Sequence, residues 1–166
     1  SGLREGSLSI DYFKDVKESE IFHKALENVA KKRGDLGSNY KKYYDFIQPV
    51  FEGNEHFNKK LLYLSCVLSH MDWGLGAFQK AELVFQETIN TPLLRLTHKE
   101  RIQLALSCYW RYCSIKYNPK MEYLTFLNNN EIFSSKQVGA ALRFSQSLTS
   151  ISTIFLEEFK LYKRGN

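Results

Sequence analysis

The sequence contains little cysteine and no long hydrophobic run. Its three cysteines, Cys66, Cys108 and Cys113, are an odd number, and none belongs to a CxxC motif. These features exclude a disulfide scaffold, and we expect buried free thiols in a reducing compartment. The longest apolar run, residues 61–68, is far shorter than the roughly 20 residues of a membrane-spanning helix. No secretory signal opens the chain, so the sequence predicts a cytoplasmic protein without membrane contact.

The common catalytic and metal-binding motifs are absent as well. The sequence has no GxSxG nucleophile elbow, no GxxxxGK[ST] phosphate loop, and no HxxxH spacing among its four histidines. His70 and Asp72 are only weak candidates for metal ligands, because residues two positions apart on a helix point about 200° apart. We therefore expect neither catalysis nor a bound metal or cofactor in this chain. His70 is instead predicted to be a half-buried residue at a helix end.

What the sequence does contain is the composition of one compact domain. Its 166 residues are 43% hydrophobic and 25% charged, both ordinary values for a globular protein, and the net charge is +5. Twelve Phe, ten Tyr and two Trp predict a core rich in large aromatic rings. The chain starts with Ser1 rather than Met and stops soon after an apolar stretch, so we expect an excised domain.

Apolar residues recur with helical periodicity along most of the chain. Strand signals are scarce, and there is no NG or DG hairpin turn. The predicted fold class is therefore all-α, a compact multi-helix bundle in a single domain. The helix from residue 101 is hydrophobic almost all round, so we expect it to be central and buried. Predicted helices cover residues of about 12–33 (ending at Gly34), 39–50, 54–68 (capped by Asn54), 78–88, 101–116 (opened by a Thr97–Glu100 capping box), 123–127, and 134–148 (opened by a second capping box, Ser134–Gln137).

Positive charge is concentrated in residues 91–120, which hold six basic residues and one acid, Glu100. We interpret this as an anion-facing patch around the buried helix, with a solvated surface face as the alternative. Free N–H groups in the first turn of that helix favour phosphate, and the Glu100 carboxylate competes for them. The candidate phosphate or polyanion ligands are His98, Arg101, Arg111 and Lys116, together with Arg143 on the last long helix.

Four short segments carry a resemblance to a known family. Residues 2–6 read GLREG, residues 68–73 LSHMDW, residues 96–106 LTHKERIQLAL and residues 138–145 VGAALRFS. In this order they are similar to the segments G-L-R-E-G, L-S-D-I-G-W, L-D-H-P-G-R-A-x-L-A-L and L-G-x-A-L-R-L-A of the exopolyphosphatase and guanosine pentaphosphate phosphatase family. The matches span nearly the whole chain.

This resemblance implies the C-terminal helical domain, of HD-like type, of an exopolyphosphatase-like hydrolase. Residues 1–10 would be a linker from a missing N-terminal actin-like phosphatase core, and residues 11–166 the helical domain. The parent enzyme would use Mg²⁺ to remove terminal phosphate from inorganic polyphosphate or guanosine pentaphosphate, and would form a homodimer. The metal-binding His-Asp pair of HD-type enzymes is matched here by Ser69 and His70. The resemblance therefore implies a non-catalytic domain that contributes a basic polyphosphate-binding surface.

Two alternatives stay open on the sequence. One is a pure dimerisation or docking module that contacts the actin-like half through surface aromatic residues. The other is a degenerate HD-type metal phosphohydrolase that uses His70, Asp72 and His98 around a divalent ion. Nucleic-acid binding is not expected, because the aromatic residues at positions 109, 110 and 112 sit on the helix that we expect to be buried.

Overall fold

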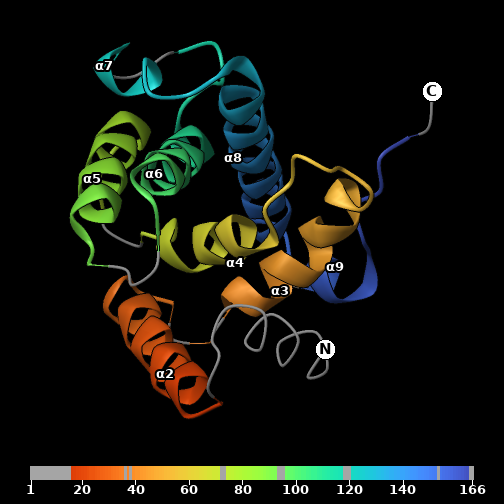
Figure 1. The fold of residues 1–166 in the computed structure, drawn as a ribbon. Coiled ribbons are helices and arrows are strands. Elements are labelled where there is room, and N and C mark those ends of the chain that lie inside the picture. The colour runs from red at the N-terminus through yellow and green to blue at the C-terminus, as the bar shows by residue number, and fades with distance from the viewer. Residues whose placement is uncertain are drawn as a thin grey trace.

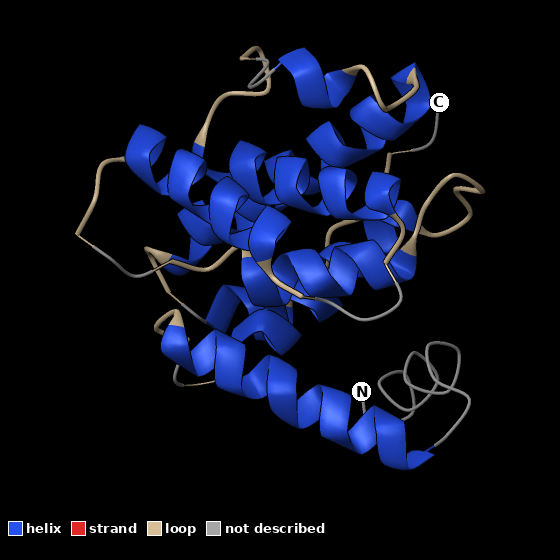
Figure 2. Cartoon of the chain, turned by 60° about the vertical axis from the view of Figure 1, so that its left-hand side comes forward, coloured by secondary structure: helices blue, strands red, loops and turns tan. Residues whose placement is uncertain are grey.

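Helices make up all the regular structure that a computed structural model describes for this protein (Figure 2). The described residues are 16–35, 37, 39–71, 74–92, 96–117, 121–152 and 154–164. They confirm the all-α prediction and form a single-domain helical bundle, whereas the predicted linker, residues 1–10, lies outside them. The elements are α2 (Val16–Lys32), α3 (Asn39–Ile47), the 3₁₀ helix η1 (Gln48–Phe51), α4 (Lys59–Leu68), α5 (Ala77–Asn90), α6 (His98–Tyr112), α7 (Met121–Leu124), α8 (Asn129–Thr149) and α9 (Ile154–Glu158).

Helix α6 occupies the centre of the bundle. Helices α5 and α8 pack along opposite sides of it, and α4 packs across a third side (Figure 1). Ten of its 15 residues are buried, which follows from a sequence that is hydrophobic around almost the whole helix circumference. The prediction of a central, buried helix is therefore confirmed. Its helical backbone ends at Tyr112, because Cys113 has an extended backbone, so Lys116 lies in the turn that follows rather than on the helix.

Two helices are capped by residues other than those predicted. Helix α4 is capped by Asn58, whose side-chain oxygen accepts the N–H groups of Lys60 and Leu61. The side chain of Asn54 instead accepts the N–H of His56 in the preceding loop. Helix α8 is opened by a capping box between Asn128 and Glu131, and Asn128 lies six residues before the predicted cap Ser134. Both predicted caps are of a residue type that commonly caps helices. In the structure a different residue forms each cap, Asn58 in place of Asn54 and Asn128 in place of Ser134.

The three cysteines are free and buried, as predicted. Burial raises the pKa of the Cys108 thiol to about 11, with the neighbouring Arg33 acting in the opposite sense. Burial also raises the pKa of Cys66 well above its ordinary value. Both thiols are thus protonated at neutral pH, which makes them poor nucleophiles.

The prediction of no membrane span can be compared with the helices directly. In the part of the chain that the structure describes, none of the helices is both long enough and apolar enough to cross a bilayer.

Candidate polyanion-binding surface

The five predicted anion ligands do not converge on one pocket. His98 and Arg101 lie in the first turn of α6, whereas Lys116 follows its last turn. A helix of 15 residues is about 22 Å long, so these two groups are separated by the length of α6. Arg143 is exposed on α8, and Arg111 is buried. A single compact phosphate pocket built from all five is therefore not formed.

The first turn of α6 is already neutralised by protein carboxylates. Glu100 closes the predicted capping box: it accepts the Thr97 N–H at 2.8 Å, and the Thr97 hydroxyl accepts the Glu100 N–H at 3.1 Å. The same carboxylate receives the Lys60 ammonium at 2.8 Å and the Asn58 amide at 3.2 Å. The Glu100 carboxylate, which we expected to compete with phosphate for the free N–H groups, therefore occupies this helix end.

A second carboxylate lies at the same end of the bundle. Glu131 closes the capping box of α8 and lies 3.5 Å from the Lys99 ammonium. The His98 ring contacts the Phe126 ring edge to face, with centroids 5.3 Å apart. With Glu100 and Glu131 both present, the first turn of α6 is a poor place for phosphate.

The Glu100 network makes stability depend on pH. Burial opposes ionisation of Glu100, but hydrogen bonds from Lys60 and Thr97 outweigh it, so the pKa of the carboxyl lies below its ordinary value of 4.5. A depressed folded-state pKa stabilises the protein above the unfolded-state pKa, and this contribution is lost as the pH falls through the folded-state value. We expect Glu100→Gln to lower the free energy of unfolding by about 1 kcal/mol or less at pH 7. In urea titrations this deficit should shrink as the pH falls below about 4.5 and vanish once the pH is below the folded-state pKa of Glu100; a deficit that stays constant over this range would contradict the assignment.

Arg111 is a structural residue rather than a surface cation. It is only 1% exposed, and its guanidinium lies 5.2 Å from the Tyr43 ring centroid and 5.5 Å from that of Tyr112. Its Nε donates to the side-chain oxygen of Gln146 at 3.0 Å and its Nη1 to the Ser69 hydroxyl at 2.8 Å. Its predicted role as an exposed polyanion ligand is therefore wrong, because α3, α4 and α8 enclose it.

A second buried guanidinium lies at the same end of α4. Arg33, which follows α2, donates to the carbonyl of Leu68, and burial lowers its pKa. The Tyr112 hydroxyl donates to the carbonyl of Ser69 at 2.7 Å. Together with Arg111, these donors satisfy polar groups at the C-terminus of α4, where the helix dipole favours positive charge.

The metal-site alternative can be tested against these contacts. His70 is half-buried and directly follows the last cap residue of α4, as predicted. Ser69 contacts the C-terminal end of α6, whereas His98 begins that helix, so His70 and His98 are held about one helix length apart. Asp72 lies outside the described residues. Within the described part of the chain, no three His, Cys, Asp or Glu side chains form a group that could hold a metal ion.

Three cations with no carboxylate partner among the described residues lie on the turn after α6 and on α8. Lys136 of α8 lies 5.3 Å from the Trp110 ring centroid, and the Trp110 indole N–H donates to the carbonyl of Tyr117 at 2.8 Å. Lys116 is the neighbour of Tyr117, and Arg143 lies two turns beyond Lys136 on the same flank of α8. We call Lys116, Lys136 and Arg143 the basic surface. Sequence analysis missed Lys136 and Tyr117, because only the tertiary contact with Trp110 brings them together.

The charge balance of this surface is one-sided. Residues 101–121 and 132–156 contain no Asp or Glu. Among the residues that the structure describes, no ion pair involves Arg101, Lys116, Lys136 or Arg143. These positive charges are therefore available to an external anion.

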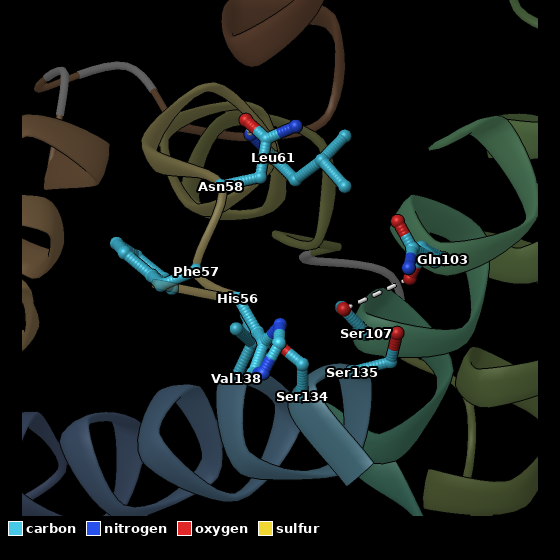
Figure 3. A pocket seen from close by; sticks show the side chains of 9 residues that line it. All are labelled: His56, Phe57, Asn58, Leu61, Gln103, Ser107, Ser134, Ser135 and Val138. Carbon is cyan, nitrogen blue, oxygen red and sulfur yellow. Dashed lines mark hydrogen bonds between the residues drawn. The ribbon is translucent and has the colours of Figure 1, made fainter. Parts of the chain in front are cut away.

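Two hollows lie on the other side of α8. The smaller one lies between residues 56–58, α6 and α8, and its volume of about 20 Å³ holds one water molecule (Figure 3). The Ser107 hydroxyl on its wall already donates to the backbone carbonyl of Gln103 at 2.9 Å. The Ser135 hydroxyl donates to the backbone carbonyl of Glu131. This pocket is too small for a phosphate ester.

The larger hollow is an open groove of about 490 Å³ that shares His56 and Ser134 with the small pocket. Its charged lining consists of Glu52, Glu55 and Lys163. Two carboxylates against one ammonium make this groove unsuitable for a polyanion. The basic surface is therefore the better candidate for anion binding.

Comparison with known proteins adds no family assignment. The chain matches no protein-family model and no curated protein.

Proposed function

We propose that this chain is a non-catalytic, polyanion-binding domain, and that its parent is an exopolyphosphatase-like hydrolase whose catalytic core is an actin-like domain pair. The observation that carries the proposal is the basic surface. Lys116, Lys136 and Arg143 are exposed or half-buried cations with no carboxylate partner among the described residues. The resemblance of residues 96–106 and 138–145 to the exopolyphosphatase family supports phosphate chains as the ligand.

A row of cations suits an extended phosphate chain better than a single phosphate. Lys136 and Arg143 are seven residues apart on α8, a spacing of about 10 Å along the helix axis. A long polyanion can reach both cations at once, and each contact releases condensed counterions. The domain would thus hold substrate by long-range attraction near the catalytic half, while Mg²⁺ and the reacting groups belong to that half.

The proposal predicts steep salt dependence. With three contacts and a slope of roughly −0.7 per contact, polyphosphate affinity should fall about 20-fold between about 50 mM and about 200 mM salt. Charge reversal by Arg143→Glu or Lys116→Glu should weaken binding several-fold at low salt and lower the salt slope by about 0.7. Titration calorimetry with medium-length polyphosphate measures both quantities.

Lys24→Glu is the matched control for that titration. Lys24 is exposed on α2 and lies outside the basic surface, so the substitution changes the net charge by the same amount. We expect its polyphosphate affinity to stay within about twofold of the unmodified protein. Equal losses in Lys24→Glu and Arg143→Glu would mean that only net charge matters. An unmodified chain that does not bind polyphosphate at low salt would overturn the proposal.

A docking role is the second candidate, and a separate set of residues favours it. Large apolar side chains are exposed near the end of α8 and on the segment that follows it, namely Phe144, Ile151, Ile154 and Phe159. Contact with the actin-like half or with a second copy of the chain would cover them. Sedimentation equilibrium tests the second case: a homodimer that Phe144→Ser dissociates would support it, and a monomer at all concentrations would contradict it.

A further inference from the structure

An exposed aromatic residue, Tyr117, lies on the turn that carries Lys116. The Tyr117 side chain is 66% exposed. Its backbone is nevertheless held in place: its carbonyl accepts the Trp110 indole N–H at 2.8 Å, and its own N–H donates to the Ser114 carbonyl at 3.0 Å. The fold therefore presents this ring to solvent from a fixed turn, rather than from a loose chain segment.

Positive charge lies close to the turn that carries the ring. Lys116 directly precedes Tyr117, and the Lys136 ammonium lies 5.3 Å from the ring centroid of Trp110, whose indole N–H donates to the Tyr117 carbonyl. Arg143 extends the same positive flank along α8. The sequence stretches in which these residues lie, 101–121 and 132–156, contain no Asp or Glu. An exposed aromatic ring on the same surface as several cations is the combination that binds a strand with phosphates and unstacked bases.

The ring discriminates between classes of polyanion. Inorganic polyphosphate has no apolar face, so an exposed tyrosine ring adds nothing to its binding. A duplex keeps its bases stacked inside and offers the ring only phosphates and sugars. A single strand presents both phosphates and free base faces, and each base stacked on an aromatic ring strengthens binding.

We propose that the basic surface binds single-stranded nucleic acid as a second ligand, with a base stacked on Tyr117 and phosphates on Lys116, Lys136 and Arg143. This inference rests on the proposed polyanion-binding function. It reverses the expectation drawn from residues 109, 110 and 112, which are indeed buried. Tyr117 lies beyond the end of α6, so its exposure is not limited by the packing of that helix.

The test compares ligands of equal charge that differ only in their bases. Fluorescence anisotropy is measured with a labelled oligothymidylate of about 15 nucleotides and with an abasic strand of the same length. The unmodified chain should bind the oligothymidylate at least fivefold more tightly than the abasic strand. Tyr117→Ala should abolish this preference, whereas Tyr117→Phe should keep it, because phenylalanine retains the ring.

Polyphosphate binding distinguishes a failure of this inference from a failure of the polyanion-binding function on which it rests. Tyr117→Ala should leave polyphosphate affinity within about twofold, since the basic surface is unchanged. Equal affinity of the unmodified chain for the abasic strand and the oligothymidylate, with polyphosphate still bound, would overturn only the nucleic-acid inference. A chain that binds neither polyphosphate nor oligonucleotide would overturn the polyanion-binding function itself. Circular dichroism on each variant checks that the fold is intact, and the comparison of the two strands on the unmodified chain keeps the inference falsifiable where Tyr117→Ala does not fold.

Discussion

Arg111→Ala is expected to destabilise the protein by about 3–5 kcal/mol, the largest effect among the proposed substitutions. The guanidinium is 1% exposed and donates to the side chains of Ser69 and Gln146, which belong to the ends of α4 and α8. Alanine leaves these two acceptors without their donor and opens a cavity between the rings of Tyr43 and Tyr112. Urea unfolding followed by circular dichroism measures the change.

Arg143→Ala is the matched control for this substitution. It removes the same side chain from an exposed position of α8, so we expect the free energy of unfolding to change by about 0.5 kcal/mol or less. Arg111→Met separates packing from hydrogen bonding, because methionine restores much of the volume without the donors. A stability loss for Arg111→Ala as small as that of Arg143→Ala would contradict the buried, enclosed position. The charge reversal Arg111→Glu is unsuitable for binding tests, since it would bury an unpaired carboxylate.

Gly139→Ala is expected to destabilise the protein by about 2 kcal/mol, although alanine is the better helix former. An added Cβ would lie 2.5 Å from the Trp110 Cβ, 3.0 Å from the Ser107 carbonyl oxygen and 3.0 Å from the Trp110 carbonyl carbon. None of these atoms can move by a side-chain rotation, so α6 and α8 must separate. We estimate an overpacking cost of about 3 kcal/mol, reduced by about 1 kcal/mol of gained helix propensity.

Gly74→Ala is the control for the glycine substitution. An added Cβ at Gly74 meets no atom within 4 Å. We expect this substitution to leave the midpoint of urea unfolding nearly unchanged. If Gly139→Ala were neutral or stabilising in the same measurement, the close approach of α6 and α8 at this position would be disproved. Because Trp110 also orders the Tyr117 turn, the separation of α6 and α8 should weaken oligonucleotide binding as well.

The helices could be predicted because their signals are local. The Thr97–Glu100 capping box forms as expected, and α6 is buried because nearly every side of it is apolar. Helix starts were less predictable, since Asn54 and Asn58 are equally good caps by residue type, and the choice between them depends on where the chain packs. The same holds for Asn128 and Ser134 at the start of α8.

The candidate site was only partly predictable, because exposure is not a local property. Arg111 and Lys116 are both basic residues near the end of one helical stretch, yet one is enclosed and the other is in solvent. The packing of α3, α4 and α8 against α6 decides this difference. That packing also brings Lys136 to Trp110, and Trp110 holds the turn of Tyr117. No spacing in the sequence connects residues 110, 117 and 136.

By itself, the sequence determined an all-α chain with a buried central helix, free buried thiols and an excess of positive charge in residues 91–120. These features follow from residue type and from periodicity along one helix, which act over a few neighbouring residues. Only the tertiary structure decided which cations reach solvent and which carboxylates neutralise them. Glu100 and Glu131 place negative charge at the first turn of α6, and Arg111 is buried near its last turn. Both results arise because helices distant in sequence pack against α6. Lys116, Lys136 and Arg143 keep no carboxylate partner among the described residues, and they lie on the turn of the exposed Tyr117 and on α8.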